Sequence, residues 1–317
     1  MFLKNNYIPK KFDESVLHVE TISKLKILTK FNFMNIVLYG VNGVGKYVLS
    51  KLILDNLFGS DVNKLQCYNE KPNYFYSSYH YEIYLEKNHN KDDLKVFIES
   101  ISNSKNIGSD FNNILIIKNA HFLDKEVLFY IKKLIECDYP IYFILLFNNM
   151  SFLPKSFKNI FLSIRVPKID KSELSLFIKS VCENEKIKIG NSTIEEMIYQ
   201  NKKNITKILI NIQYYKKTNK LLKYSNSEID KLLQLVYERK NTNILKIRET
   251  LYDLTSKGIQ KKLLIDYSVE QMLKRIKDQE TKMEFISDIC KMDENFSVSY
   301  KELIHLDYFF ILLMKYC

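Results

Sequence analysis

Three of the seven glycines in this 317-residue chain fall within six residues, in the segment Gly40-Val41-Asn42-Gly43-Val44-Gly45-Lys46. This spacing is that of a P-loop, G-x-x-x-x-G-K, whose glycines let the backbone approach phosphate oxygens and offer them N–H groups. The ammonium of Lys46 would reach a β-phosphate, and a helix after the loop would point its positive end at the same phosphates. The chemistry that these residues indicate is nucleotide binding.

Hydrolysis needs further groups: a hydroxyl after the lysine for Mg²⁺, and carboxylates at the end of a second strand. Here Tyr47 follows the lysine, and the apolar run 114–117 ends in Lys118-Asn119-Ala120-His121. We therefore expect a phosphate cradle without metal, a degenerate ATPase site and no enzyme activity in this chain. Lys118 could offset phosphate charge in place of a metal. His121 could act as a base, although a solvated loop histidine is the more common case.

A parallel sheet between helices would position these groups. Residues 35–39 and 113–117 each begin with Asn and are otherwise apolar, and residues 141–147 are apolar throughout. Helix-periodic segments at 47–57, 92–102 and 124–136 alternate with these runs. Such runs are typical of strands buried on both faces. The chain through residue 168 is therefore predicted to be a doubly wound α/β domain. Residues 79–85 and 163–166 are further expected strands, and everything after residue 170 reads as helices.

Composition narrows the function classes. With 46% apolar and 27% charged residues the chain reads as a globular protein, and it has no apolar run long enough to span a bilayer. Its N-terminus lacks the apolar core of a secretory signal, and five scattered cysteines without C-x-x-C indicate reduced thiols. We expect a protein that is neither secreted nor bound to a membrane.

The net charge of +11 has two readings. It suggests an anionic partner such as nucleic acid, but AT-rich codons would give the same excess of Lys, Asn, Ile and Tyr. Only four of the 48 basic residues are Arg. A surface rich in Lys suits attraction to phosphates without regard to sequence better than it suits reading of bases.

Several segments resemble motifs of one family, in that family's order. Tyr7-Ile8-Pro9-Lys10-Lys11-Phe12-Asp13 resembles its opening Y-R-P-K-x-[FL]-D, and residues 39–46 resemble its Walker A loop. Residues 117–123 lie at Walker B, residues 141–165 resemble the sensor-1 strand and its loop, and residues 248–254 and 304–307 resemble collar segments. Over its full length the chain resembles a small subunit of the replication factor C clamp loader, a AAA+ family. Within the family it is most similar to the non-catalytic end subunit.

The resemblance implies three domains: an AAA+ P-loop α/β domain (1–168), a helical lid (169–223) and an all-α collar for oligomerisation (224–317). It implies no catalytic residue and no metal, with degenerate Walker B positions Lys118 and Asn119 and a degenerate arginine-finger position Ile160. ATP or ADP, bound without Mg²⁺, would contact the following residues: Gly40, Val41, Asn42, Gly43, Val44, Gly45, Lys46, Tyr47, the sensor-1 Asn148, the sensor-2 position Lys207, Tyr7 and Pro9.

The function that the resemblance implies is that of a non-catalytic subunit in a heteropentameric clamp loader. Its partners would be the other subunits, a PCNA-like sliding clamp and the backbone of primer–template DNA. It would work in the nucleus, or in a viral replication factory if the AT-rich genome is that of a large DNA virus. Two alternatives stay open: a weak DNA-dependent ATPase, and a stand-alone DNA-binding AAA+ protein of origin-recognition type.

Overall fold

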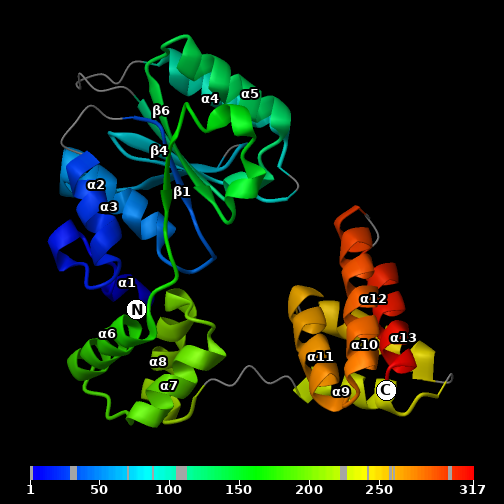
Figure 1. Cartoon of the computed structure of the whole chain (residues 1–317). Coiled ribbons are helices and arrows are strands. Elements are labelled where there is room, and N and C mark those ends of the chain that lie inside the picture. The colour runs from blue at the N-terminus through cyan, green and yellow to red at the C-terminus, as the bar shows by residue number, and fades with distance from the viewer. Residues whose placement is uncertain are drawn as a thin grey trace. The chain divides into compact units, whose positions relative to one another are not determined.

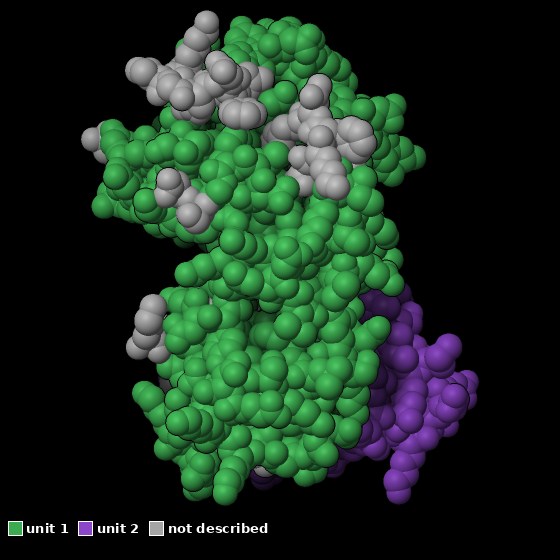
Figure 2. Space-filling model, turned by 90° about the vertical axis from the view of Figure 1, so that its left-hand side faces the viewer, with its two compact units in different colours: residues 1–222 green, residues 223–317 purple. Residues whose placement is uncertain are grey.

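The chain forms two compact units, residues 1–222 and residues 223–317 (Figure 2). The computed structural model describes residues 3–28, 34–69, 71–87, 89–104, 113–221, 227–240, 243–256, 259, 261–298 and 302–317. The predicted boundaries at residues 168 and 223 remain predictions.

The described part of the first unit contains a seven-stranded sheet in the order β2-β3-β4-β5-β6-β1-β7. Five of its strands run parallel: β4 (His80–Tyr84), β5 (Asn113–Lys118), β6 (Ile141–Phe147), β1 (Ile36–Tyr39) and β7 (Leu162–Arg165). The central β1 pairs with β6 and β7, so that Leu38 lies opposite both Leu146 and Ile164. The prediction of an α/β fold with a mostly parallel sheet is confirmed.

Helices cover both faces of this sheet (Figure 1). On one face α2 (Val19–Leu28) and α3 (Lys46–Phe58) pack on Ile36 and Leu38 of β1. On the other face α4 (Lys91–Asn103) and α5 (Lys125–Glu136) pack on a cluster that includes Val37 of the same strand. Successive strand residues point to opposite faces, which is why a strand between two helical layers must be apolar at every position.

An antiparallel hairpin, β2 (Gln66–Tyr68) and β3 (Tyr74–Tyr76), extends the sheet beyond β4. The sequence did not predict it. All three residues of β2 are exposed, so the strand has no buried face and shows no alternation of apolar and polar residues. Tyr74 packs the hairpin against α4, because the centre of its ring lies 4.5 Å from the centre of the Phe97 ring.

Helices α6 (Lys171–Asn184), α7 (Asn191–Gln200) and α8 (Ile205–Thr218) follow the sheet and share a core with Leu3 of the short α1 (Leu3–Asn6). Single-turn helices occupy several connections: Phe12–Glu14, Ser60–Asn63, Ala120–Phe122, Met150–Phe152 and Lys155–Phe157.

The described residues of the second unit form only helices: α9 (Ser227–Tyr237), α10 (Asn243–Ser256), α11 (Lys261–Arg275), α12 (Gln279–Val298) and α13 (Glu302–Lys315). Their core is rich in aromatic side chains, with Phe285, Phe309 and Phe310 buried. Arg248 of α10 donates to Asp307 of α13 at 2.8 Å. Across the described residues of both units, no helix combines the length and apolarity needed to cross a bilayer.

Candidate functional site

The glycine loop connects the end of β1 to the start of α3. Gly43 and Gly45 have φ angles of 81° and 101°, in the left-handed region that favours glycine. A Cβ on Gly40 would lie 2.3 Å from the carbonyl oxygen of Val166, so only glycine fits between the loop and the segment after β7. The motif therefore adopts the backbone that its spacing predicts.

The first turn of α3 faces this loop and has no side-chain cap, since Gly45 occupies the N-cap position. The first N–H groups of any helix lack carbonyl partners within the helix, and the helix dipole makes this end positive. A phosphate group would satisfy these N–H groups. The local geometry thus fits a phosphate of a nucleotide.

Lys46 turns its ammonium back over the loop. The Nζ atom donates to the carbonyl oxygens of Gly40 and Val41, the latter at 3.0 Å, and to Oδ1 of Asn148 at 3.3 Å. Burial lowers the pKa of Lys46 to about 8. The structure thus brings together two predicted nucleotide-binding residues that are 102 positions apart in the sequence.

His121 extends this network. Its Nε2 atom lies 3.2 Å from Nδ2 of Asn148. Because the ammonium of Lys46 can only donate, Asn148 must accept with Oδ1 and donate with Nδ2, and Nε2 of His121 must then be unprotonated. Burial and the nearby Lys46 both lower the pKa of His121, in keeping with a neutral ring. The expectation of a solvated loop histidine is wrong, and Lys46, Asn148 and His121 form one chain of hydrogen bonds.

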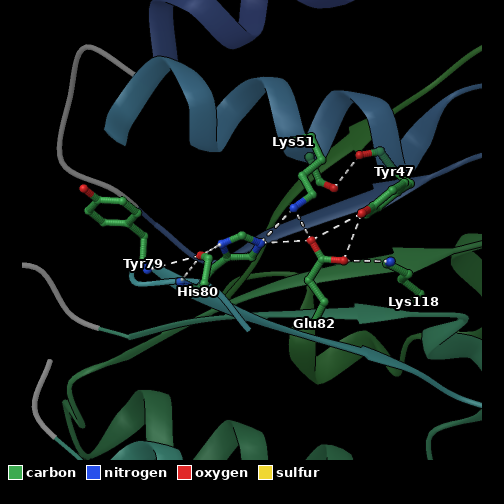
Figure 3. Close-up of polar contacts among 8 residues, drawn as sticks. Tyr47, Lys51, Tyr79, His80, Glu82 and Lys118 are labelled. Carbon is green, nitrogen blue, oxygen red and sulfur yellow. Dashed lines mark hydrogen bonds and ion pairs between the residues drawn. The ribbon is translucent and has the colours of Figure 1, made fainter. Parts of the chain in front are cut away.

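Tyr47 points away from the loop, into a buried polar cluster that the sequence did not predict (Figure 3). Its hydroxyl donates to Oε2 of Glu82 at 3.0 Å, and burial together with Glu82 raises the pKa of Tyr47. Lys118 lies 2.7 Å from the same oxygen and 3.7 Å from the centre of the Tyr47 ring. Lys51 forms an ion pair with the other oxygen, Oε1. The ammonium of Lys118 is therefore held by Glu82 rather than offered to a phosphate.

His80 completes this Glu82 cluster from β4. The hydroxyl oxygen of Ser77 already accepts from the backbone N–H groups of Tyr79 and His80, and it lies 2.6 Å from Nδ1 of His80. The Nε2 atom of His80 lies 2.9 Å from Oε1 of Glu82 and 3.0 Å from Nζ of Lys51. Burial lowers the pKa of His80, so the ring is neutral.

Glu82 itself is fully buried. Burial alone would raise its pKa, but the His80 hydrogen bond and the ammonium groups of Lys118 and Lys51 outweigh burial and hold the pKa well below its usual range. The sequence held one signal of this cluster: Glu82 is a charged residue inside an expected strand of aromatic and apolar residues. A buried charge needs partners of opposite charge or hydrogen-bond donors.

Helix α8 covers the glycine loop. The N–H of Ile205 donates to the backbone carbonyl oxygen of Gly43 at 3.0 Å. The side-chain amide of Asn204 donates to the backbone carbonyl oxygen of Asn42 at 3.3 Å. Asn204 also accepts from the backbone N–H of Lys207 and so caps the helix. The side chain of Lys207 is exposed on the first turn.

We expect Gly43→Ala to separate the loop from α8. An added Cβ would lie about 2.1 Å from the Asn204 amide, in a backbone conformation that alanine rarely adopts. The loss should be about 2 kcal/mol of unfolding free energy, in the range for overpacking combined with backbone strain. Asn204→Gly by itself should cost only a few tenths of a kcal/mol, because glycine is an acceptable N-cap residue. In this background the loss of unfolding free energy caused by Gly43→Ala should fall by about half. Equal losses in both backgrounds would show that Asn204 is not the obstacle. Urea unfolding of the four proteins measures this.

Other predicted positions lie apart from this network. The hydroxyl of Tyr7 donates to Glu185 of α6 at 3.1 Å, and Ile160 packs against the core beside α5. Asn119, with a φ of 55°, donates its amide to the carbonyl oxygen of Leu85. The nucleotide-binding roles of Tyr7, Pro9 and Lys207 remain predictions. Among the described residues no group of three or more His, Cys, Asp or Glu side chains could hold a metal.

The sheet order, the glycine loop after the central strand and the following helices define the AAA+ class of P-loop proteins. Solved structures share this fold. Two mutant forms of RuvB from Thermotoga maritima match with TM-scores of 0.53 and 0.51 at 14% and 16% identity. The matches cover 80% and 84% of this chain, and 86% and 79% of the RuvB chains.

Sequence comparison shows which proteins this chain is similar to. Residues 227–317 match the family described as "Replication factor C subunit 3, C-terminal domain". Replication factor C subunit 5 of Saccharomyces cerevisiae is 25% identical over 351 residues, with 98% of each chain covered. A putative replication factor C small subunit of Acanthamoeba polyphaga mimivirus is 23% identical, with 98% of this chain and 89% of that one covered. Over nearly its whole length the chain is therefore similar to replication factor C small subunits.

These comparisons correct one prediction. The expectation of a degenerate site without enzyme activity is wrong: the replication factor C relatives and the RuvB structures are AAA+ ATPases, and nothing in the described residues shows a degenerate site. The residue types at Lys118, Asn119 and Ile160 depart from a motif. A departure from a motif says which side chain is absent at one position, but not which groups the fold brings there from elsewhere.

Proposed function

We propose that this chain is one subunit of a heteropentameric clamp loader, which helps to place a PCNA-like ring on primer–template DNA at sites of replication in a nucleus or a viral factory. The observation that carries this proposal is the match of residues 227–317 to a replication factor C C-terminal domain, behind a complete P-loop domain. An origin-recognition protein would carry strands in this region, whereas its described residues form helices. The Lys-rich surface suits contact with a DNA backbone.

Within this role, we propose that the loop Gly40–Lys46 binds the phosphates of ATP or ADP. Lys46 and Asn148 lie beside the loop, and the first turn of α3 supplies N–H donors. The hydroxyl of Tyr47 is engaged with Glu82 and is not free to ligate Mg²⁺. Nucleotide affinity should therefore change less than about threefold between EDTA and Mg²⁺, a difference below 1 kcal/mol, in calorimetric titrations.

Native mass spectrometry tests the assembly. The chain is co-expressed with the other clamp-loader-like proteins of its genome. We expect a pentamer that contains this chain once, with the added mass of one nucleotide on this subunit. A monomer that never associates would contradict the clamp-loader proposal and favour a stand-alone AAA+ protein. Turnover of ATP by the pentamer, with and without Lys46→Ala in this subunit, measures its share of hydrolysis.

A further inference from the structure

The sheet of the first unit has an open edge along β7. In the described part of the chain this strand pairs with β1 alone. The N–H groups of Leu162 and Val166 donate toward β1, to the carbonyl oxygens of Asn35 and Tyr39 at 2.8 Å each. Alternate residues of a strand direct their N–H and C=O groups to opposite sides. Ser163 therefore directs its backbone groups to the open edge, and Arg165 does the same two residues later.

A groove follows this edge. One hollow of about 460 Å³ lies between α2 and β7, lined by Thr21, Lys24, Ile27, Ser163, Ile164 and Arg165. A second hollow of about 590 Å³ lies between the start of the glycine loop and the residues after β7. Arg165 and Lys168 line it together with Gly40, Val41 and Asn148 of the candidate nucleotide site. Arg165 lines both hollows, beside the edge strand.

The groove is positively charged. Lys24, Arg165 and Lys168 are exposed, and no carboxylate of the described residues pairs with any of them. No Asp or Glu lines either hollow. Lys91 and Lys95 of α4, by contrast, both contact Glu126. Arg165 is also the single arginine among residues 1–222. Three unpaired cations and an unpaired strand edge thus coincide.

We propose that this β7 groove binds an extended acidic segment of a partner protein as an additional strand of the sheet. An edge strand offers both N–H donors and C=O acceptors, and a peptide backbone satisfies both kinds. A nucleic-acid backbone offers phosphate acceptors and would leave the outward carbonyl groups of Ser163 and Arg165 unpaired. Acidic side chains at alternate positions of the peptide would all lie on one face of the added strand, where the cations beside β7 would attract them. The proposal does not depend on nucleotide binding or clamp loading.

Fluorescence anisotropy with the full chain and three labelled probes tests whether the β7 groove binds an acidic strand. The first probe is a labelled ten-residue peptide of alternating Val and Glu; the others are its Val–Lys counterpart and a single-stranded oligonucleotide. We expect saturable binding of the Val–Glu peptide and at least tenfold weaker binding of the Val–Lys peptide. Stronger binding of the oligonucleotide than of the Val–Glu peptide would overturn the proposal in favour of a phosphate-binding surface.

Two variants separate backbone pairing from charge. Ser163→Pro removes an outward N–H but none of the hydrogen bonds to β1, which an edge position tolerates, and Arg165→Glu reverses the central charge. Each should weaken Val–Glu binding at least tenfold, whereas Lys188→Glu, on an exposed lid loop, should not. Unchanged binding by folded Ser163→Pro would overturn strand addition.

Hydrogen exchange on the unmodified chain gives a readout that does not depend on any variant's folding. The amides of Ser163 and Arg165 should gain protection when the Val–Glu peptide binds, because each would donate to the added strand. No gain at these two amides would overturn the proposal. Sedimentation shows whether the chain dimerises. A dimer that is lost in Ser163→Pro would assign the β7 edge to a second copy of the chain instead.

Discussion

Replacing Glu82 with alanine should cost about 3–5 kcal/mol of unfolding free energy, the range found when one partner of a buried ion pair is removed. The fully buried carboxylate is contacted by Lys51, Lys118, His80 and Tyr47. Its loss leaves the ammonium of Lys51, whose side chain is 9% exposed, without an anion. Chemical denaturation followed by circular dichroism measures the loss.

The matched control is Glu86→Ala, because Glu86 follows the same strand but is exposed. It should change stability by less than about 0.5 kcal/mol. Glu82→Gln tests the charge with little change of volume and should lose most of the same free energy. Combining Glu82→Gln with Lys51→Met should restore part of the lost unfolding free energy, because the double variant no longer buries the unpaired ammonium of Lys51. Equal unfolding midpoints for Glu82→Ala and Glu86→Ala would show that the cluster does not stabilise the fold.

The same cluster predicts a pH dependence. The pKa of Glu82 in the folded chain lies below its ordinary value of 4.5, so its ionised form contributes stability above that pH. This contribution is lost progressively as the pH falls below 4.5 toward the pKa of the folded state. The difference in unfolding free energy between the unmodified chain and Glu82→Gln should therefore shrink in acid and be largest near neutral pH.

Replacing Lys46 with alanine should weaken ATP and ADP binding about 10- to 150-fold, which corresponds to the 1.5–3 kcal/mol of a hydrogen bond to a charged group. The Lys46 ammonium is already held beside the loop by the carbonyl oxygens of Gly40 and Val41 and by Oδ1 of Asn148. A charged phosphate oxygen is a stronger hydrogen-bond acceptor than any of these neutral oxygens. Calorimetry in EDTA measures the affinity. Lys155→Ala, an exposed lysine after β6, is the control and should bind normally. Unchanged affinity in Lys46→Ala would show that nucleotide does not bind on this loop.

Lys46 also predicts weaker binding in alkaline solution. Because burial lowers its pKa to about 8, most chains carry the ammonium at pH 7 and most have lost it at pH 9. Affinity for a nucleotide should fall by up to about tenfold between these values, since each unit above the pKa lowers the protonated fraction about tenfold. Lys46→Arg stays protonated throughout and should show no such decline. A flat profile in the unmodified chain would contradict the assigned role.

Much of this protein follows from local sequence patterns. The spacing of Gly40, Gly43 and Gly45 predicts the loop, because backbone conformation depends on each residue and its neighbours. Apolar runs predict β1, β5 and β6, because a strand between two helical layers has no solvent-facing side. The β2–β3 hairpin escaped prediction since its exposed residues carry no such pattern.

Tertiary structure decided which distant side chains meet. Strand order places Glu82 of β4 beside Lys118 of β5, and α3 adds Tyr47 from 35 positions away. It also brings His121 to Asn148 and leaves the outer groups of β7 without a neighbouring strand. Local patterns specify how each segment folds and which face it buries, but the partners of a polar side chain depend on how the segments pack against one another. For that reason the sequence alone predicted the phosphate loop, whereas the Glu82 cluster, the His121 contact and the β7 groove became visible only in the folded chain.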